Sequence, residues 1–225
     1  MKALAENLWI AEQCLPHPEF KLPFLKMKNK MTVVRLQDGG LLVHSPIRLT
    51  AELRQELKTL GELRYVMVPN LFHHLFVLDY LALEPKPTLM APVSIRRKRP
   101  DLPVAQELPQ ALAPLRDDLV GIEVAGHRAD ETVLYHPASK TLVVTDLAYN
   151  ITDGTGMERA WFRIFGKLGS PCLPVYHRLA VTDRKQLRRA LDQILELDFE
   201  RLIVGHGDII ERQPREAFRT LWRWI

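Results

Sequence analysis

The chain has 225 residues, of which 47% are hydrophobic and 26% charged, and its formal net charge is +4 with a sequence pI of about 9.1. This balance supplies enough apolar material for one large α/β domain, or for two small ones, and it excludes disorder as the dominant state. The two cysteines, Cys14 and Cys172, lie far apart, so we expect neither a disulfide framework nor a cysteine-rich zinc site.

The N-terminal residues and the overall hydropathy pattern argue against export and membrane insertion. Glu6 and Glu12 fall where a signal peptide needs an apolar core. No apolar run approaches the roughly 20 residues that a membrane-spanning helix requires. We therefore expect a cytoplasmic protein with no membrane partner.

The first part of the chain is predicted to form strands. Residues 8–11 (LWIA) are a short apolar run. Residues 30–36 (KMTVVRL) and 41–44 (LLVH) flank a turn at 37–40 (QDGG), a pattern typical of a β-hairpin.

A helix and a buried strand are predicted next. Thr50 is a suitable N-cap, and Leu53, Leu57 and Leu60 recur at helical spacing after it. Residues 64–68 (RYVMV) are apolar and β-branched, as expected for a strand that is buried on both faces.

Beyond this strand the pattern predicts a second helix over 74–85, a short strand over 88–92 and an irregular, proline-rich surface connection over 92–118. The connection carries a basic run at 96–99 (RRKR) that could meet RNA, an anionic substrate or a lipid surface. No aromatic residues are interleaved with the run to stack bases, so we interpret it as a solvated loop and expect no nucleic-acid partner.

The second half repeats the alternation of strands and helices. Its predicted strands cover 121–127, 132–136, 141–146 and 201–208, and its predicted helices lie within 151–169, after Asp183 and after Pro214. No linker is long enough to separate two domains. The simplest arrangement is a single α/β domain over 1–225, with two mixed sheets face to face and helices outside.

Side chains that can bind metal ions recur just past the ends of the predicted strands. They are His73, His74, His127, Asp146, His206 and Asp208. A lone histidine is more often hydrogen-bonded or exposed than a ligand, and an aspartate after a strand is often a helix N-cap. Their recurrence at four strand ends nevertheless favours a shared site, because imidazole and carboxylate are ligands for zinc, iron and manganese.

Taken in order, these segments resemble the metallo-β-lactamase superfamily over nearly the whole chain, which implies its four-layer αββα sandwich. Gly126-His127 resembles a Gly-His motif of the family, and Asp146 resembles its bridging aspartate. The loop after residues 201–204 resembles the family's late Gly-His loop, so His206 would be the last ligand.

The first metal motif departs from the family's His-x-His-x-Asp-His pattern. A gapless alignment of the first loop places Asn70 and Phe72 at the two leading histidine positions, His74 at the aspartate and Leu75 at the final histidine. A shift by one residue places His73 and His74 on the last two positions instead. Both registers stay open, and the Asn-x-x-His-His pattern resembles an uncharacterised branch of the superfamily.

The resemblance implies a metal site built from His73, His74, His127, Asp146 and His206, holding one zinc, iron or manganese ion and at most a weakly held second one. Our first hypothesis is a metal-dependent hydrolase in which Asp146 and His74 act in catalysis through a metal-activated water. Its small-molecule substrate would be an ester, thioester, lactone or phosphodiester, and the basic run favours an anionic one.

The alternative hypothesis is a catalytically inactive, metal-free scaffold that binds a ligand or partner in the degenerate pocket. Phe72 and Leu75, which cannot coordinate a cation, favour this alternative. Two further segments have structural interpretations: residues 157–169 form a pocket wall or lid in the resemblance, and Trp222 and Trp224 suit packing or homodimer contacts.

Overall fold

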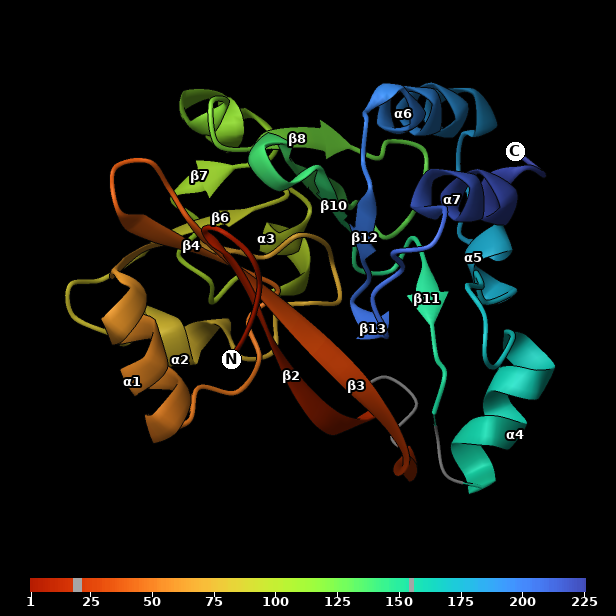
Figure 1. The fold of residues 1–225 in the computed structure, drawn as a ribbon, viewed down its shortest axis with the longest axis horizontal. Helices are drawn as coiled ribbons and strands as arrows, with labels where there is room; N and C mark the ends of the chain where they lie inside the picture. Colours follow the sequence, from red (N-terminus) through yellow and green to blue (C-terminus); the bar gives the residue numbers. More distant parts are fainter. Residues whose placement is uncertain (18–21, 154–155) are drawn as a thin grey trace.

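The apolar runs of the first half form one seven-stranded mixed sheet in the computed structural model, which describes residues 1–17, 22–153 and 156–225 (Figure 1). Its strands follow the chain order: β1 (Lys2–Ala5), β2 (Leu8–His17), β3 (Leu22–Arg35), β4 (Gly40–His44), β5 (Glu62–Met67), β6 (Thr88–Ala91) and β7 (Gln106–Glu107). Strands β1 to β4 pair antiparallel, and β4 to β7 pair parallel.

The second half forms a four-stranded mixed sheet in the order β12 (Arg201–Ile203), β10 (Thr141–Val143), β9 (Thr132–His136) and β8 (Val120–Glu123). Strands β10 and β12 pair parallel, and the other neighbours pair antiparallel. A separate parallel pair joins β11 (Tyr149–Asn150) to β13 (His206–Gly207).

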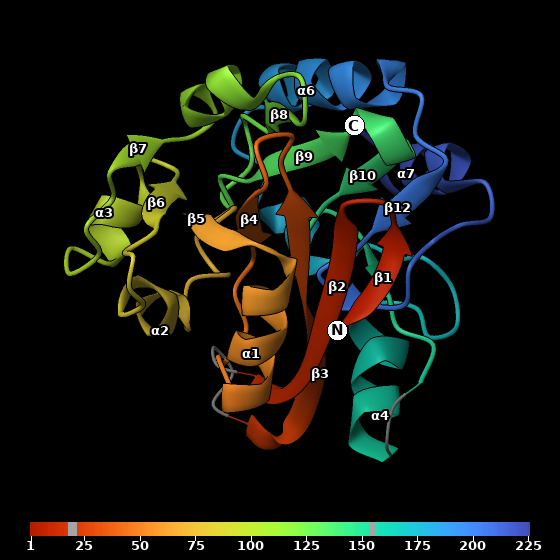
Figure 2. The same cartoon turned by 60° about the vertical axis from the view of Figure 1, so that its left-hand side comes forward.

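Helices lie outside the two sheets, on opposite sides of the molecule (Figures 1 and 2). The first sheet is accompanied by α1 (Ala51–Leu60), α2 (Val77–Leu81) and α3 (Ile95–Lys98), and the second sheet by α6 (Arg184–Glu196) and α7 (Pro214–Trp222). The remaining helices are α4 (Gly156–Phe165), α5 (Tyr176–Leu179) and the 3₁₀ segments η1 (Gln110–Leu115) and η2 (Pro137–Ser139). None of the described helices is long and apolar enough to cross a membrane.

Three apolar clusters hold these layers together. One lies between the two sheets and includes Leu42, Met90 and Ile203. The other two lie between each sheet and its helices, with Val66 in the first and Leu202 in the second. Burial of these side chains is the main force that stacks the layers, so the predicted arrangement of two mixed sheets with helices outside is confirmed.

Two of the helix starts that the sequence marks are confirmed by a side-chain cap. The Thr50 hydroxyl accepts a hydrogen bond from the Leu53 amide at the start of α1, at 3.2 Å. The Asp183 carboxylate accepts from the amides of Lys185 and Gln186 at the start of α6. In each case the side chain satisfies amides that the first helical turn leaves unpaired.

Two predictions for residues 74–118 are wrong in detail. The second helix covers Val77–Leu81 rather than 74–85, and the connection that follows is not irregular throughout. It contains α3, β7 and η1, because buried side chains such as Leu102, Leu108 and Leu112 anchor it between its prolines. Three residues of the basic run, Arg96 to Lys98, lie in α3 and Arg99 caps it, so the run is not a loop, although Arg96, Arg97 and Lys98 are exposed as predicted.

Candidate metal centre

Three potential metal ligands meet just beyond the ends of three strands. His73 lies in the loop after β5, Asp146 follows β10, and His206 follows β12. One ligand atom from each lies within 4.8 Å of the others. Among the residues that the structure describes, no other three histidine, cysteine, aspartate or glutamate side chains come together in this way. Their side chains are 7%, 6% and 8% exposed, respectively. The strands thus deliver two imidazoles and one carboxylate to one buried point.

The carboxylate of Asp146 lies between the two imidazoles. Its Oδ2 is 3.5 Å from His73 Nε2, and its Oδ1 is 3.3 Å from His206 Nε2. The two imidazole rings lie with their centroids 5.1 Å apart. Two histidines and one carboxylate form a set that suits zinc, iron(II) or manganese(II) and leaves further coordination positions open.

His73 is oriented by two neighbours. Its Nδ1 lies 2.7 Å from the hydroxyl oxygen of Ser45, the residue that follows β4. The side-chain oxygen of Asn70 accepts hydrogen bonds from the amides of Phe72 and His73, at 2.8 and 3.0 Å. This side-chain turn fixes the loop and directs the His73 imidazole toward Asp146.

Asn70 also connects the loop to the second sheet. Its Nδ2 lies 2.7 Å from Asp146 Oδ2, 2.8 Å from Thr145 Oγ1 and 3.0 Å from Glu131 Oε2. Glu131 in turn accepts hydrogen bonds from the amides of Thr145 and Asp146. Asn70 is fully buried. At the position that the gapless alignment assigns to the family's first histidine ligand, this chain therefore has an amide side chain, which hydrogen-bonds Asp146.

His206 is oriented from the side of the first sheet. Its Nδ1–H donates to the carbonyl oxygen of Lys28 in β3, at 3.1 Å. A carbonyl can only accept, so Nδ1 carries a proton, and Nε2 is the ring nitrogen that faces Asp146. Tyr149 stacks on the ring of His206 with centroids 5.0 Å apart, and its hydroxyl donates to Asp146 Oδ1 at 2.7 Å.

The electrostatics of the two buried carboxylates differ. Burial and the nearby charge of Asp146 raise the pKa of Glu131. Burial opposes ionisation of Asp146 as well, but His73 and His206 hold the pKa of Asp146 well below its usual value. Asp146 is therefore the carboxylate that stays charged, as a metal ligand must be.

The other two predicted ligands lie outside this group. His74 Nδ1 accepts a hydrogen bond from Arg99 Nη1 at 2.9 Å, and burial, with Lys98 and Arg99 nearby, lowers the pKa of His74 to about 4. His127 uses both ring nitrogens on the backbone: Nε2–H donates to the His177 carbonyl at 3.2 Å, and Nδ1 accepts from the Ala129 amide at 3.2 Å. Of the two adjacent histidines, it is therefore His73 that faces Asp146.

The sequence pattern did not point to several residues around the three ligands. Tyr149 and His177 are both buried, and His177 Nε2 lies 3.4 Å from the Tyr149 hydroxyl. The His177 ring also stacks on His127 with centroids 5.4 Å apart. Tyr149 follows Asp146 by three residues, but no spacing rule links it to a metal site, and His177 reaches the site only through the packing of α5.

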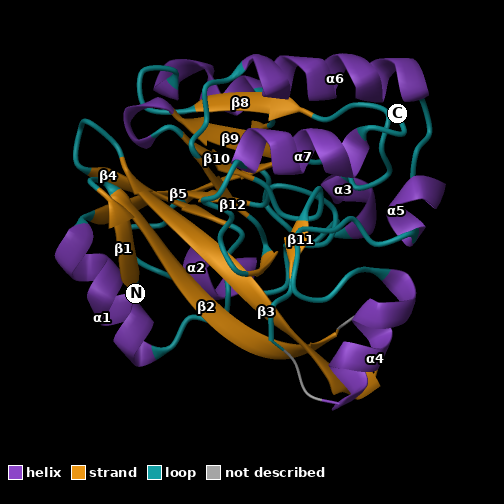
Figure 3. Cartoon of the chain, turned by 45° about the vertical axis from the view of Figure 1, so that its right-hand side comes forward, coloured by secondary structure: helices purple, strands orange, loops and turns teal. Residues whose placement is uncertain are grey.

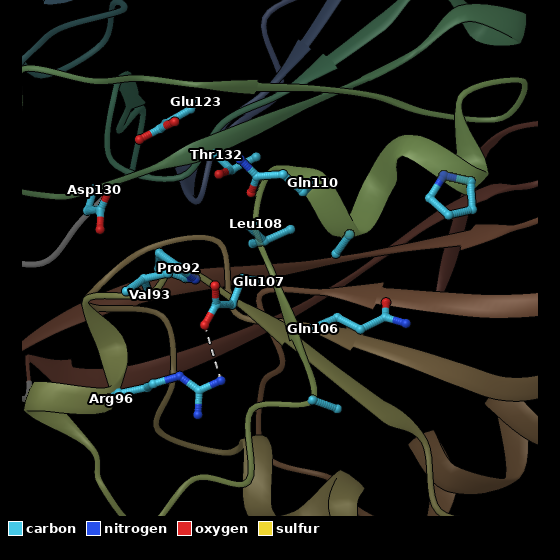
Figure 4. Close-up of a pocket in the computed structure, with 13 residues that line it drawn as sticks. Pro92, Val93, Arg96, Gln106, Glu107, Leu108, Gln110, Glu123, Asp130 and Thr132 are labelled. Carbon is cyan, nitrogen blue, oxygen red and sulfur yellow. Dashed lines mark hydrogen bonds and ion pairs between the residues drawn. The ribbon is translucent and has the colours of Figure 1, made fainter.

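A separate pocket of about 710 Å³ lies at the edges of both sheets, lined in part by β7 and β8 (Figure 4). Arg96 and Glu107 form an ion pair of 3.3 Å in it, and Glu123 and Asp130 also line it. None of its lining residues belongs to the group of three ligands. Asp130 and Thr132, which line this pocket, flank Glu131, which lies beside the candidate metal centre and contacts Asn70.

Comparisons with known proteins identify the fold. Residues 6–91 match the model of a family described as a domain of unknown function (DUF4336), and this match includes His73 and His74 but neither Asp146 nor His206. No curated protein sequence matches the chain.

Solved structures of metallo-β-lactamases are similar along almost the whole chain. The enzyme from Erythrobacter litoralis, with β-mercaptoethanol in its active site, has a TM-score of 0.65 and 13% identity over 100% of this chain and 96% of that one. DIM-1, exposed to ceftazidime, has a TM-score of 0.65 and 16% identity over 98% of this chain and 94% of that one. FIM-1 from Pseudomonas aeruginosa, in its mono-zinc form, has a TM-score of 0.63 and 12% identity over 98% of this chain and 92% of that one. At these identities the similarity shows the metallo-β-lactamase fold and does not carry an activity.

Proposed function

We propose that this chain of metallo-β-lactamase fold is a metal-dependent hydrolase that works with a single divalent ion held by His73, Asp146 and His206. The observation that carries the proposal is the buried group of three ligand atoms within 4.8 Å of one another. Each histidine of the group has its other ring nitrogen engaged, with Ser45 or with the Lys28 carbonyl. Such outer contacts are typical of metal-ligating histidines.

A divalent ion on these three side chains would lower the pKa of a coordinated water and polarise a carbonyl or phosphoryl oxygen. The chain's own contribution is to hold the ligands and keep Asp146 charged. Tyr149 and Asn70 each donate to one oxygen of Asp146, which fixes the plane of the carboxylate. The mono-zinc form of FIM-1 supports a single ion on this fold, and the three-ligand set accommodates zinc, iron or manganese.

The substrate class that we propose is an ester, thioester, lactone or phosphodiester. The basic run of α3 lies against the loop that carries His73, because Lys98 Nζ donates to the Leu71 carbonyl at 2.7 Å. This placement supports an anionic substrate. Arg96 and Arg99 form ion pairs with Glu107 and Asp101, however, so half of the run is neutralised by its own neighbours.

The adjacent histidines allow a matched test. The protein is stripped with a chelator, reloaded with zinc, manganese or iron(II), and assayed on chromogenic esters, thioesters, lactones and phosphodiesters. We expect metal-dependent turnover that falls at least about 100-fold in His73→Ala, because a ligand is lost, and changes less than about tenfold in His74→Ala. Turnover that is independent of metal, or equal losses in the two variants, would contradict the proposal.

A metal-free scaffold is the second candidate, and one observation favours it. Both oxygens of Asp146 already accept hydrogen bonds from the protein, from Tyr149 at 2.7 Å and from Asn70 at 2.7 Å. The carboxylate is therefore satisfied without a cation. Besides turnover, the two candidates differ in the number of metal ions that the wild-type protein binds.

A further inference from the structure

A buried lysine lies in the middle of β3, close to the candidate ligand His206. Lys30 is 2% exposed, and its ammonium forms an ion pair of 2.6 Å with Glu12, which lies opposite it on β2. The same ammonium donates a hydrogen bond to the carbonyl oxygen of Gly207. Burying an ammonium is unfavourable unless it is paired with an opposite charge and hydrogen-bonded. Here one of its hydrogen-bond acceptors is the carbonyl oxygen of Gly207, the residue that follows His206.

The segment Lys28–Lys30 holds each of the three residues 205–207. The Lys30 amide donates to the Gly205 carbonyl at 2.9 Å, the Lys28 carbonyl accepts from His206 Nδ1 at 3.1 Å, and the Lys30 ammonium reaches the Gly207 carbonyl. The ligand is thus held directly and on both sides by one strand. That strand belongs to the first sheet, whereas the strand leading to His206, β12, belongs to the second.

Gly207 leaves this turn little freedom on its other side. Its φ of +92° is a conformation that side chains other than glycine rarely adopt, and a Cβ there would overlap the carbonyl oxygen of Asn150. The turn is therefore confined between β11 and β3. Without the Lys30 ammonium, the Gly207 carbonyl would lose its charged donor. The turn would then keep two of its three hydrogen bonds to β3.

We propose that Lys30 is a positioning residue of the metal centre, which keeps the Gly207 turn against β3 so that His206 stays hydrogen-bonded to the Lys28 carbonyl and presents Nε2 to the ion. Glu12 holds the Lys30 ammonium in this place. The inference rests on the proposed metal centre. It does not require Lys30 to contact the metal or the substrate.

The test is the double variant Glu12→Gln/Lys30→Met, which removes both charges of the pair and so leaves no buried charge without its partner. The matched control, Glu216→Gln/Arg219→Met, removes an exposed ion pair of 2.7 Å from α7, away from the candidate metal centre. Metal affinity is measured by competition with a chromogenic chelator, using zinc and manganese. We expect the test variant to bind about 10–100-fold more weakly and the control to stay within about threefold of the wild type.

Two readouts separate positioning from a merely structural role. The melting temperature of the metal-free test variant is expected within about 4 °C of the wild type, and ¹⁵N NMR of its histidines is expected to show His206 losing its fixed Nδ1–H tautomer. Unchanged affinity and an unchanged tautomer would overturn the inference, as would equal losses in test and control. If the wild type binds no metal, the proposed function fails, and the tautomer in the metal-free proteins still decides the role of Lys30.

Discussion

His44 is a buried imidazole that the proposed chemistry does not use. It lies at the end of β4, opposite Thr32 and Met67, and is 1% exposed. Among the residues that the structure describes, neither of its ring nitrogens has a hydrogen-bond partner. Burial, with His73 nearby, lowers the pKa of His44 to about 3. The ring is therefore neutral in the folded protein and carries an unsatisfied donor, which lowers the free energy of unfolding.

The depressed pKa of His44 predicts a loss of stability in acid. The unfolded chain protonates this group near its ordinary value of 6.5, whereas the folded chain does not until about 3. Below pH 6.5 the unfolded state thus binds more protons, and this group lowers the free energy of unfolding by about 1.4 kcal/mol per pH unit down to about pH 3.

His44→Leu should remove this dependence and, at pH 7.5, stabilise the fold by about 1–3 kcal/mol through loss of the unsatisfied donor. Urea unfolding of the metal-free proteins at pH 7.5 and 5 measures both effects. The same slope between these pH values in the two proteins would show that His44 is not buried as a neutral ring.

The element that fixes the position of His127 is the start of α6. Gly126 has φ of +84°, and a Cβ on it would overlap the carbonyl oxygen of Asp183, the N-cap of that helix. The amides of Thr182 and Asp183 donate to the Gly126 carbonyl at 2.8 and 3.2 Å. The Gly126 backbone thus packs against the start of α6, and both ring nitrogens of His127 are hydrogen-bonded to backbone groups.

Gly126→Ala tests this account with a control from the same chain. Gly169 has a similar φ of +79°, but a Cβ there would meet nothing within 4 Å. Gly169→Ala should therefore cost only the backbone strain, roughly 1–2 kcal/mol, whereas Gly126→Ala should cost about 1–3 kcal/mol more because of the overlap. Equal changes in the urea unfolding free energy would contradict the close packing of α6 on this loop.

The existence and order of the strands could be predicted from the sequence, and with them the places of His73, Asp146 and His206, because apolar runs give way there to polar side chains. The strand ends were less exact, since β10 ends at Val143 and β12 at Ile203, earlier than predicted. The sequence could not show which of His73 and His74 faces the site, because the Asn70 side-chain turn sets the direction of each ring. Contacts such as Asn70 to Asp146 and Tyr149 to His206 depend on how the two sheets pack. A pattern along one chain does not contain that information.

At the scale of the whole molecule, the two sheets contribute different parts of the candidate centre. The loop after β5 supplies His73, the strands of the second sheet lead to Asp146 and His206, and β3 contacts His206 through the Lys28 carbonyl. In Figures 2 and 3, strands β8, β9, β10 and β12 of the second sheet lie above the long strands β2 and β3 of the first. The ligands converge only when both sheets are stacked. A metal ion bound there would therefore join the two halves and stabilise the folded state in proportion to its concentration and affinity.

The most direct measurement is the number of metal ions bound per chain after dialysis against zinc, manganese or iron(II), determined by elemental analysis. We expect about one ion for the wild type and for His74→Ala, and less than about a tenth of an ion for His73→Ala and for the double variant Asp146→Ala/His206→Ala. Less than about a tenth of an ion on the wild type after metal is supplied would contradict the proposed metal centre. The chain would then be a metal-free scaffold whose Asp146 is satisfied by Tyr149 and Asn70.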